Sequence, residues 1–163
     1  MRIGITGHQR LKSDAKWSWV TSVIREYLVT IPPPIVGITS LAIGADQLFA
    51  RSVLDLGGSL IAVLPFSDIE RTFTPADIPA FRELLSRSSV ETLEPRANDQ
   101  DSYLAAGRRV ADIADIVIAV WDGLPAKGPG GTADAVQYAI TRSVPLMHIN
   151  PDRSTVSWIT SGR

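Results

Sequence analysis

The sequence contains no cysteine and only two histidines, His8 and His148. Without cysteine there can be no disulfide bond, no thiol nucleophile and no thiolate metal ligand. The two histidines are far apart in the chain and lack the spacing that metal ligands usually show. The sequence therefore predicts no metal site, and we expect no resident cofactor.

Long apolar runs are also missing. No run approaches the roughly 20 residues that span a bilayer. Met1 leads directly into RIGITG, without the charged head and apolar stretch of a signal peptide. We therefore expect a cytoplasmic protein without a membrane partner.

Basic charge is not in excess. Lysine and arginine total 16 against 17 aspartates and glutamates, which gives a formal net charge of -1 and a pI near 6.1. A surface that binds DNA non-specifically usually carries an excess of basic charge. The charge balance therefore argues against nucleic acid as a partner.

The length and composition favour one folded unit. The chain has 163 residues, of which 45% are hydrophobic and 20% are charged, and this is enough for one core but short for two. We expect residues 1–150 to form a single domain and residues 151–163 a mostly polar C-terminal tail, although Trp158 and Ile159 could dock on it.

Short apolar runs alternate with segments of helical periodicity. The expected strands are Ile3–Thr6, Ile35–Thr39, Leu60–Leu64, Val90–Leu93, Ile116–Trp121 and Val144–Ile149. One helix should begin after Ser13 and end before Pro32, because a serine can cap a helix start and proline cannot continue a helix. The other expected helices are Ala45–Leu56, Ala76–Ser88, Tyr103–Ala114 and Thr132–Arg142. Four of the strands are nearly free of polar alternation, which is typical of a parallel sheet covered on both faces. The pattern predicts a Rossmann-like three-layer α/β/α sandwich with a mainly parallel six-stranded sheet.

The loops that follow the strands are the candidate binding segments, because ligands of such folds lie beyond the carboxyl ends of the strands. In the first loop, GITGHQRL, Gly7 allows the main chain to approach a ligand, and His8 and Arg10 add donors. A tight turn with surface polar side chains is the alternative. In the second loop, SLAIGAD, Gly44 lies at the turn and Asp46 in the first helical turn. Asp46 could instead serve only as a helix cap.

The third and fourth loops carry groups suited to a base and a phosphate. In LPFSDIERTF, Phe66 and Arg71 supply an aromatic plane and a guanidinium, although Phe66 could equally belong to the core. The fourth loop, WDGLPAKGPGGTADAV, ends in Gly130, Gly131 and Thr132 at the start of a helix, where backbone N–H groups and a hydroxyl make a phosphate cradle.

These blocks resemble the SLOG superfamily of Rossmann-like nucleotide-ligand domains, and they span nearly the whole chain. The segment SLAIGADQLFARSVLDLGGSLIAVLPF is similar to the DNA-processing protein A branch. The segment with PGG before Thr132 is similar to the LONELY GUY phosphoribohydrolase branch, whose corresponding helix start binds phosphate. Ala135 stands where that branch expects a glutamate, and Arg108 or Arg109 matches its paired arginine approximately.

Three functions remain open at this point. The first is binding or sensing of a nucleotide or nucleotide-derived molecule through the phosphate-cradling loops. The second is nucleotide N-glycosidase or ribosyl transferase activity, in which Asp134 or Asp122 would act as the catalytic carboxylate. The third is an interaction module that binds protein or DNA. By analogy with proteins of similar fold, we also expect a homodimer.

Overall fold

The computed structural model describes residues 1–125 and 131–160. Its strands are β1 (Arg2–Gly7), β2 (Val36–Thr39), β3 (Ser59–Leu64), β4 (Ser88–Thr92), β5 (Ile116–Val120), β6 (Leu146–Asn150) and β7 (Thr155–Ile159). Its helices are α1 (Ala15–Val29), α2 (Ala45–Asp55), the short 3-10 helix η1 (Ile69–Thr72), α3 (Ile78–Ser86), α4 (Asp99–Ile113) and α5 (Thr132–Thr141).

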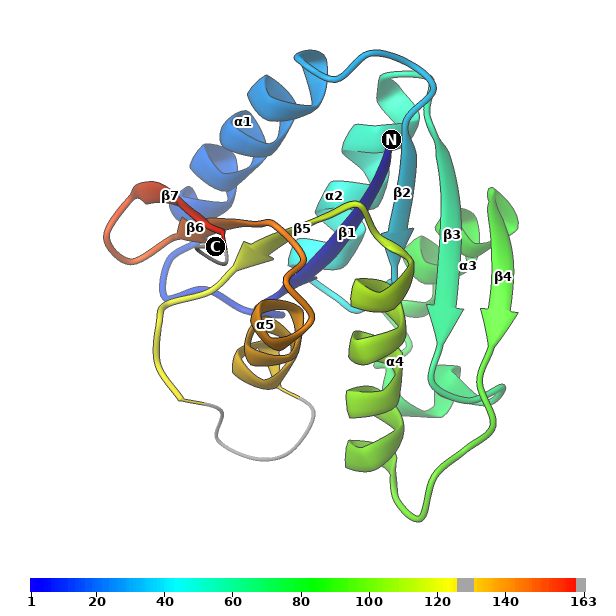
Figure 1. The fold of residues 1–163 in the computed structure, drawn as a ribbon. Helices are drawn as coiled ribbons and strands as arrows, with labels where there is room; N and C mark the ends of the chain where they lie inside the picture. The colour runs from blue at the N-terminus through cyan, green and yellow to red at the C-terminus, as the bar shows by residue number, and fades with distance from the viewer. Residues whose placement is uncertain (126–130, 161–163) are drawn as a thin grey trace.

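The strands form one sheet in the order β4-β3-β2-β1-β5-β6-β7 (Figure 1). Neighbouring strands from β4 to β6 run parallel, and only β7 is antiparallel to its neighbour. The chain first adds strands on one side of β1 and then returns to add β5 and β6 on the other side. The order therefore reverses between β1 and β5, and in open α/β sheets ligands bind at such a point.

Helices cover both faces of the sheet, as the continuously apolar strands predict. Along β5, Ile116, Ile118 and Val120 pack into the core beneath α1, α2 and α3, while Val117 and Ala119 face α5 on the other side. The two sets alternate because successive side chains of a strand point to opposite faces. This arrangement confirms the Rossmann-like three-layer α/β/α sandwich.

The sheet has one strand more than the six predicted. Residues Thr155–Ile159, expected to lie in a polar tail, form β7 and pair with β6, so that Met147 lies opposite Trp158. Trp158 also makes an edge contact with Tyr27 of α1, with 5.5 Å between ring centroids. An edge strand is paired on one side only and stays largely exposed, so β7 lacks the apolar run that marks a buried strand. Within the described residues, no helix is both long enough and apolar enough to span a membrane.

Candidate ligand-binding site

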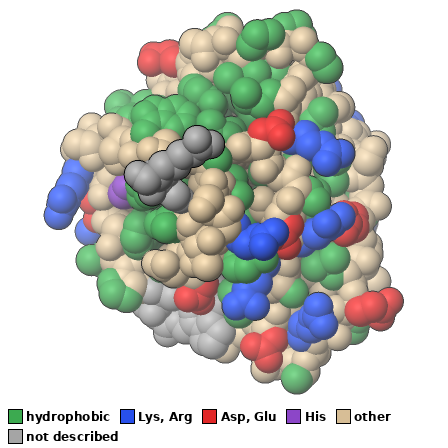
Figure 2. All heavy atoms as spheres, viewed as in Figure 1, with side chains coloured by type: hydrophobic (Ala, Val, Ile, Leu, Met, Phe, Trp, Pro, Cys, Tyr) green, Lys and Arg blue, Asp and Glu red, His purple; other side chains and the backbone are tan. Residues whose placement is uncertain are grey.

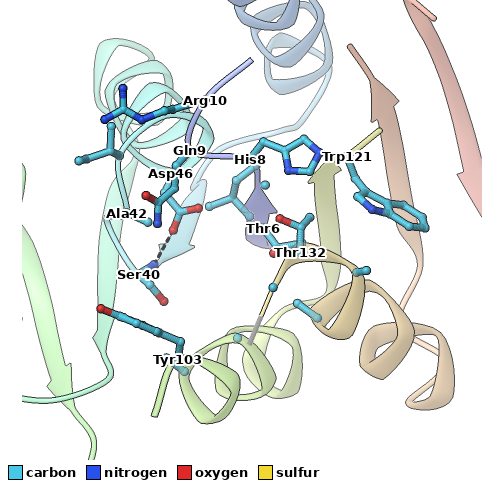
Figure 3. Close-up of a pocket in the computed structure, with 18 of the residues that line it drawn as sticks. Thr6, His8, Gln9, Arg10, Ser40, Ala42, Asp46, Tyr103, Trp121 and Thr132 are labelled. Carbon is cyan, nitrogen blue, oxygen red and sulfur yellow. Dashed lines mark hydrogen bonds between the residues drawn. The ribbon is translucent and has the colours of Figure 1, made fainter. Parts of the chain in front are cut away.

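A cavity of about 740 Å³ opens at the carboxyl ends of the parallel strands (Figure 3). Its walls come from the loops that follow β1, β2, β3 and β5, from one face of α4 and from the start of α5. Of the residues predicted for the site, those that line the cavity are Gly7, His8, Arg10, Asp46, Asp122, Gly131 and Thr132. The structure thus brings together loops that are more than 100 residues apart in the chain.

The loop after β1 is held tightly between β5 and α2. The His8 N–H donates to the carbonyl oxygen of Val120 at 3.0 Å, and the Ala45 N–H donates to the carbonyl oxygen of His8 at 3.2 Å. A Cβ added at Gly7 would lie 2.5 Å from the Cβ of Ala45 and 2.9 Å from that of Val120. Glycine is therefore required at position 7 by the packing of these two neighbours.

Gly44 does not line the cavity among the described residues, but it holds the second loop against the first. Its φ is +88°, a backbone conformation that other residues rarely adopt. A Cβ there would lie 2.5 Å from the carbonyl oxygen of Gln9 and 2.6 Å from that of His8. Gly44 thus positions His8 and its neighbours at the cavity.

Asp46 is buried at the base of the cavity, where only 5% of the residue is exposed. Its Oδ2 accepts the Thr39 hydroxyl and the Ser40 N–H, each at 2.9 Å (Figure 3). Burial is the largest influence and raises the pKa of Asp46 to about 6, although these hydrogen bonds favour the ionised form. The side chain therefore orders the loop before α2 instead of capping the first turn of the helix.

Asp122 and His8 form a second polar group in the cavity. The Asp122 N–H donates to His8 Nε2 at 3.1 Å, and the same ring nitrogen lies 3.3 Å from Asp122 Oδ1. The Leu124 N–H donates to Oδ1 at 2.9 Å. Burial opposes ionisation of Asp122, but the hydrogen bond from the Leu124 N–H, the interactions with the His8 ring and the charge of Lys12 together outweigh it, so the pKa of Asp122 is lowered.

The start of α5 faces the cavity through Gly131 and Thr132. Gly131 has an extended backbone with φ of -78°, which any residue can adopt. Asp134 lies in the first turn of α5, and its backbone N–H donates to the carbonyl oxygen of Gly131 at 3.1 Å. Its side chain is not part of the cavity wall among the described residues. Gly130 lies outside the described residues.

Phe66 and Arg71, which were predicted for the site, do not line the cavity among the described residues. Phe66 is buried, with 3% of the residue exposed, and the Arg71 guanidinium lies 4.7 Å from the centroid of its ring. Arg71 is paired with Asp99 at 2.6 Å and with Asp68 at 3.0 Å. The aromatic residues that line the cavity at this point are Tyr103 and Phe73, and the Phe73 ring packs on Phe81 of the core with 4.8 Å between centroids.

Arg108 lies in a second, shallower hollow on the outer side of α4. Its guanidinium lies 5.3 Å from the centroid of the Tyr138 ring. Arg109, beside it, is paired with Glu91 at 2.7 Å. Neither arginine lines the main cavity among the described residues, because both occupy the face of α4 that is turned away from it.

Several cavity residues were not singled out from the sequence. Among them are Tyr103, Trp121, Ser40 and Lys12. Tyr103 belongs to the apolar stripe of α4, which is also the pattern of a core-facing residue. Ser40 and Trp121 directly follow strands, and this position was a signal that could have identified them.

Solved structures share this fold at low sequence identity. The DNA processing protein A of Helicobacter pylori is 18% identical, with a TM-score of 0.66 over 91% of this chain and 64% of that chain. The Streptococcus pneumoniae protein is 19% identical, with a TM-score of 0.65 over 90% of this chain and 49% of that chain. The molybdenum cofactor carrier protein of Chlamydomonas reinhardtii is 15% identical, with a TM-score of 0.52 over 91% of this chain and 75% of that chain.

These neighbours, at 15% to 19% identity, show that the chain shares their fold. No protein-family model and no curated protein matches the chain. The chain spans less than two thirds of the length of either DNA processing protein A structure.

The prediction, made from the net charge, that nucleic acid is not a partner is wrong. The Helicobacter pylori protein, whose fold this chain shares, binds single-stranded DNA. A net charge near zero does not exclude such a partner, because cations can gather locally. Here Lys and Arg side chains gather over α4 with acidic ones among them (Figure 2), and Arg96, Arg108 and Arg109 line the hollow beside that helix.

Proposed function

We propose that this protein binds a nucleotide or a nucleotide-derived molecule in the cavity at the carboxyl ends of the strands. The observation that carries the proposal is the position of α5, whose first turn opens on the cavity with Gly131 and Thr132 in its wall. A helix start offers backbone N–H donors and a partial positive charge, which together suit a phosphate group.

The size and place of the cavity support the same function. Small-molecule sites usually measure about 300–1,000 Å³, and a volume of about 740 Å³ falls within that range. The cavity also lies where the strand order reverses between β1 and β5. This is the position at which doubly wound α/β folds bind their ligands.

Basic side chains at the cavity rim suit an anionic ligand. Arg10, Lys12 and His8 all lie in the loop after β1 and line the cavity. Lys12 is paired with Asp152 of the turn after β6. Arg10 has no carboxylate partner among the described residues, so its guanidinium is available to a phosphate.

The contribution of Thr132 gives the first test. Thr132→Ala removes a hydroxyl at the helix start, and a lost hydrogen bond costs about 0.5–1.5 kcal/mol, or about 1.5–3 kcal/mol when the partner is charged. We expect the affinity for AMP or ribose 5-phosphate to fall about 2-fold to 150-fold in isothermal titration calorimetry. Thr141→Ala, at the other end of α5, serves as the matched control and should leave the affinity unchanged.

The titration should include a single-stranded oligothymidylate, because a protein of the same fold binds such DNA. Equal binding by wild type and Thr132→Ala would place the phosphate elsewhere. The absence of heat from every phosphorylated probe would contradict the proposed function.

A nucleotide N-glycosidase is the second candidate, and one observation favours it. Asp46 and Asp122 line the same cavity, yet the pKa of Asp46 is raised to about 6 and that of Asp122 is lowered. Carboxyls whose pKa values are pushed apart can divide the roles of acid and base. Ionised Asp122 would stabilise positive charge on a ribosyl centre as the bond to the base breaks, and protonated Asp46 would donate its proton to the leaving base. Water would then add to the sugar and give up a proton that returns to Asp46.

Release of free base from AMP, followed by chromatography, distinguishes the two candidates. We expect base release only if the second candidate is right, and then its loss in Asp122→Asn while the variant remains folded. Binding of AMP without any base release would leave the protein as a binding domain.

A further inference from the structure

Tyr103 is an aromatic side chain on the wall of the cavity. It lies away from the start of α5, where the phosphate is proposed to bind. Figure 3 shows Tyr103 on the same side of the cavity as Ser40 and Asp46, and Thr132 nearer to His8 and Trp121. Tyr103 is therefore away from the proposed phosphate position at Thr132, on the side of the cavity that also carries Ser40 and Asp46.

The Tyr103 ring packs against Phe66 of the core, and the exposed Arg71 side chain lies against Phe66 in turn. The centroid of the Tyr103 ring lies 5.8 Å from that of Phe66, and the Arg71 guanidinium lies 4.7 Å from the Phe66 centroid. Phe66 is almost fully buried, whereas Tyr103 is only half-buried and lines the cavity. Phe66 thus supports the Tyr103 ring, and neither Phe66 nor Arg71 lines the cavity among the described residues.

The first turn of α4, which carries Tyr103, is fixed by its neighbours. Arg71 donates two hydrogen bonds to Asp99, at 2.6 and 2.9 Å. The Asn98 side chain caps the helix by accepting the Asp101 N–H at 2.9 Å. A ring held in place before a ligand arrives loses little conformational freedom on binding, so its contact contributes more fully to affinity.

The same face of α4 leaves room beside the ring. Ala106 and Gly107 follow Tyr103 by about one helical turn and line the cavity. The other large aromatic residue near the phosphate end, Trp121, is already engaged. Its Nε1 donates to the carbonyl oxygen of Leu124 at 2.8 Å, and its ring packs against His148 with 5.3 Å between centroids.

We propose that Tyr103 is the stacking platform for a planar aromatic base, so that the cavity selects phosphorylated ligands that carry such a base over those that do not. This inference rests on the proposed function, because it requires the phosphate of the ligand to lie at the start of α5. It goes further by assigning the residue that recognises the rest of the ligand.

Calorimetric titration with AMP, UMP and ribose 5-phosphate tests the inference, because ribose 5-phosphate has the sugar and the phosphate but no base. We expect wild type to bind at least one of the two nucleotides more tightly than ribose 5-phosphate. Tyr103→Ala should weaken nucleotide binding about 5-fold to 150-fold, the usual range for loss of one aromatic stacking partner. Ribose 5-phosphate binding should change by no more than about 2-fold.

Two further variants separate stacking from a general loss of structure. Tyr103→Phe keeps the ring and should keep the preference for the nucleotide. Tyr138→Ala removes a tyrosine of α5 that lies outside the main cavity, in the second hollow, and should leave all three affinities unchanged.

The outcomes distinguish this inference from the proposed function. If wild type binds ribose 5-phosphate as tightly as both nucleotides, or if Tyr103→Ala keeps the full preference, the assignment of Tyr103 is overturned while phosphate binding stands. If none of the three compounds binds wild type, the proposed function fails and the inference fails with it. Loss of the preference in Trp121→Leu but not in Tyr103→Ala would assign stacking to the tryptophan and overturn the proposal.

Discussion

Replacement of Gly44 by alanine should lower the free energy of unfolding by about 2–6 kcal/mol. Two costs combine in this estimate. A non-glycine residue at φ +88° and ψ -121° is strained by about 1–3 kcal/mol, and forcing extra atoms into a packed region costs about 1–3 kcal/mol more. The added Cβ would meet the carbonyl oxygens of His8 and Gln9, and backbone atoms cannot move aside as the end of a side chain can.

Urea unfolding measures this effect, and Gly57→Ala is the matched control. Gly57 also has a positive φ, +76°, but a Cβ there meets no atom within 4 Å. Its substitution should therefore cost only the backbone strain. The difference between the losses of unfolding free energy at Gly44 and at Gly57 measures the close contact between the loops after β1 and β2. Equal losses at the two positions would contradict that contact. If Gly44→Ala fails to fold while Gly57→Ala folds, this result would agree with the larger loss of stability expected at Gly44.

The second large effect is a dependence of stability on pH that comes from Asp46. Its pKa rises from 3.8 to about 6 on folding, so the folded state binds more protons than the unfolded state between these values. The contribution of Asp46 to stability is therefore full below about pH 4 and is lost as pH rises through 6. Two pKa units correspond to about 3 kcal/mol.

Asp46→Asn removes this titration and keeps an oxygen that can accept from Thr39 and Ser40. We expect the free energy of unfolding of wild type to fall between pH 4 and pH 7 by about 3 kcal/mol more than that of the variant. Asp55→Asn, an exposed substitution at the end of α2, is the control and should follow wild type closely. Parallel curves for wild type and Asp46→Asn would show that Asp46 is not desolvated in the folded protein.

Much of the fold could be predicted from local pattern. Continuous apolar runs identified the parallel strands, because a strand covered on both faces needs apolar side chains in both directions. The strand β7 could not be predicted in this way, because Val156 and Trp158 remain partly exposed and the strand is stabilised by its pairing with β6. Only four residues separate β7 from its partner β6, so the short turn between two antiparallel strands was the signal that could have identified it.

The candidate site was predictable to the level of loops but not of side chains. The rule that ligands lie beyond the carboxyl ends of parallel strands selected the loops that contain His8, Asp46 and Thr132. It could not tell whether Phe66 or Tyr103 would face the cavity, because both belong to apolar patterns. The choice depends on how α4 is rotated against the sheet, and this rotation is set by buried residues of α4 such as Ala106 and Val110, which pack on Ile38 and Val63.

The central place of β1 has a consequence for synthesis of the chain on the ribosome. Ile3 pairs with Gly37 on one side but with Ile116 on the other. Translation adds about 5–20 residues per second. The edge of β1 that pairs with β5 therefore stays unpaired for roughly 6–20 seconds, until β5 is synthesised. Contacts between such distant segments also slow folding after release. We expect nascent chains halted before residue 116 to expose the β1 edge and to depend on chaperones that shield unpaired strands.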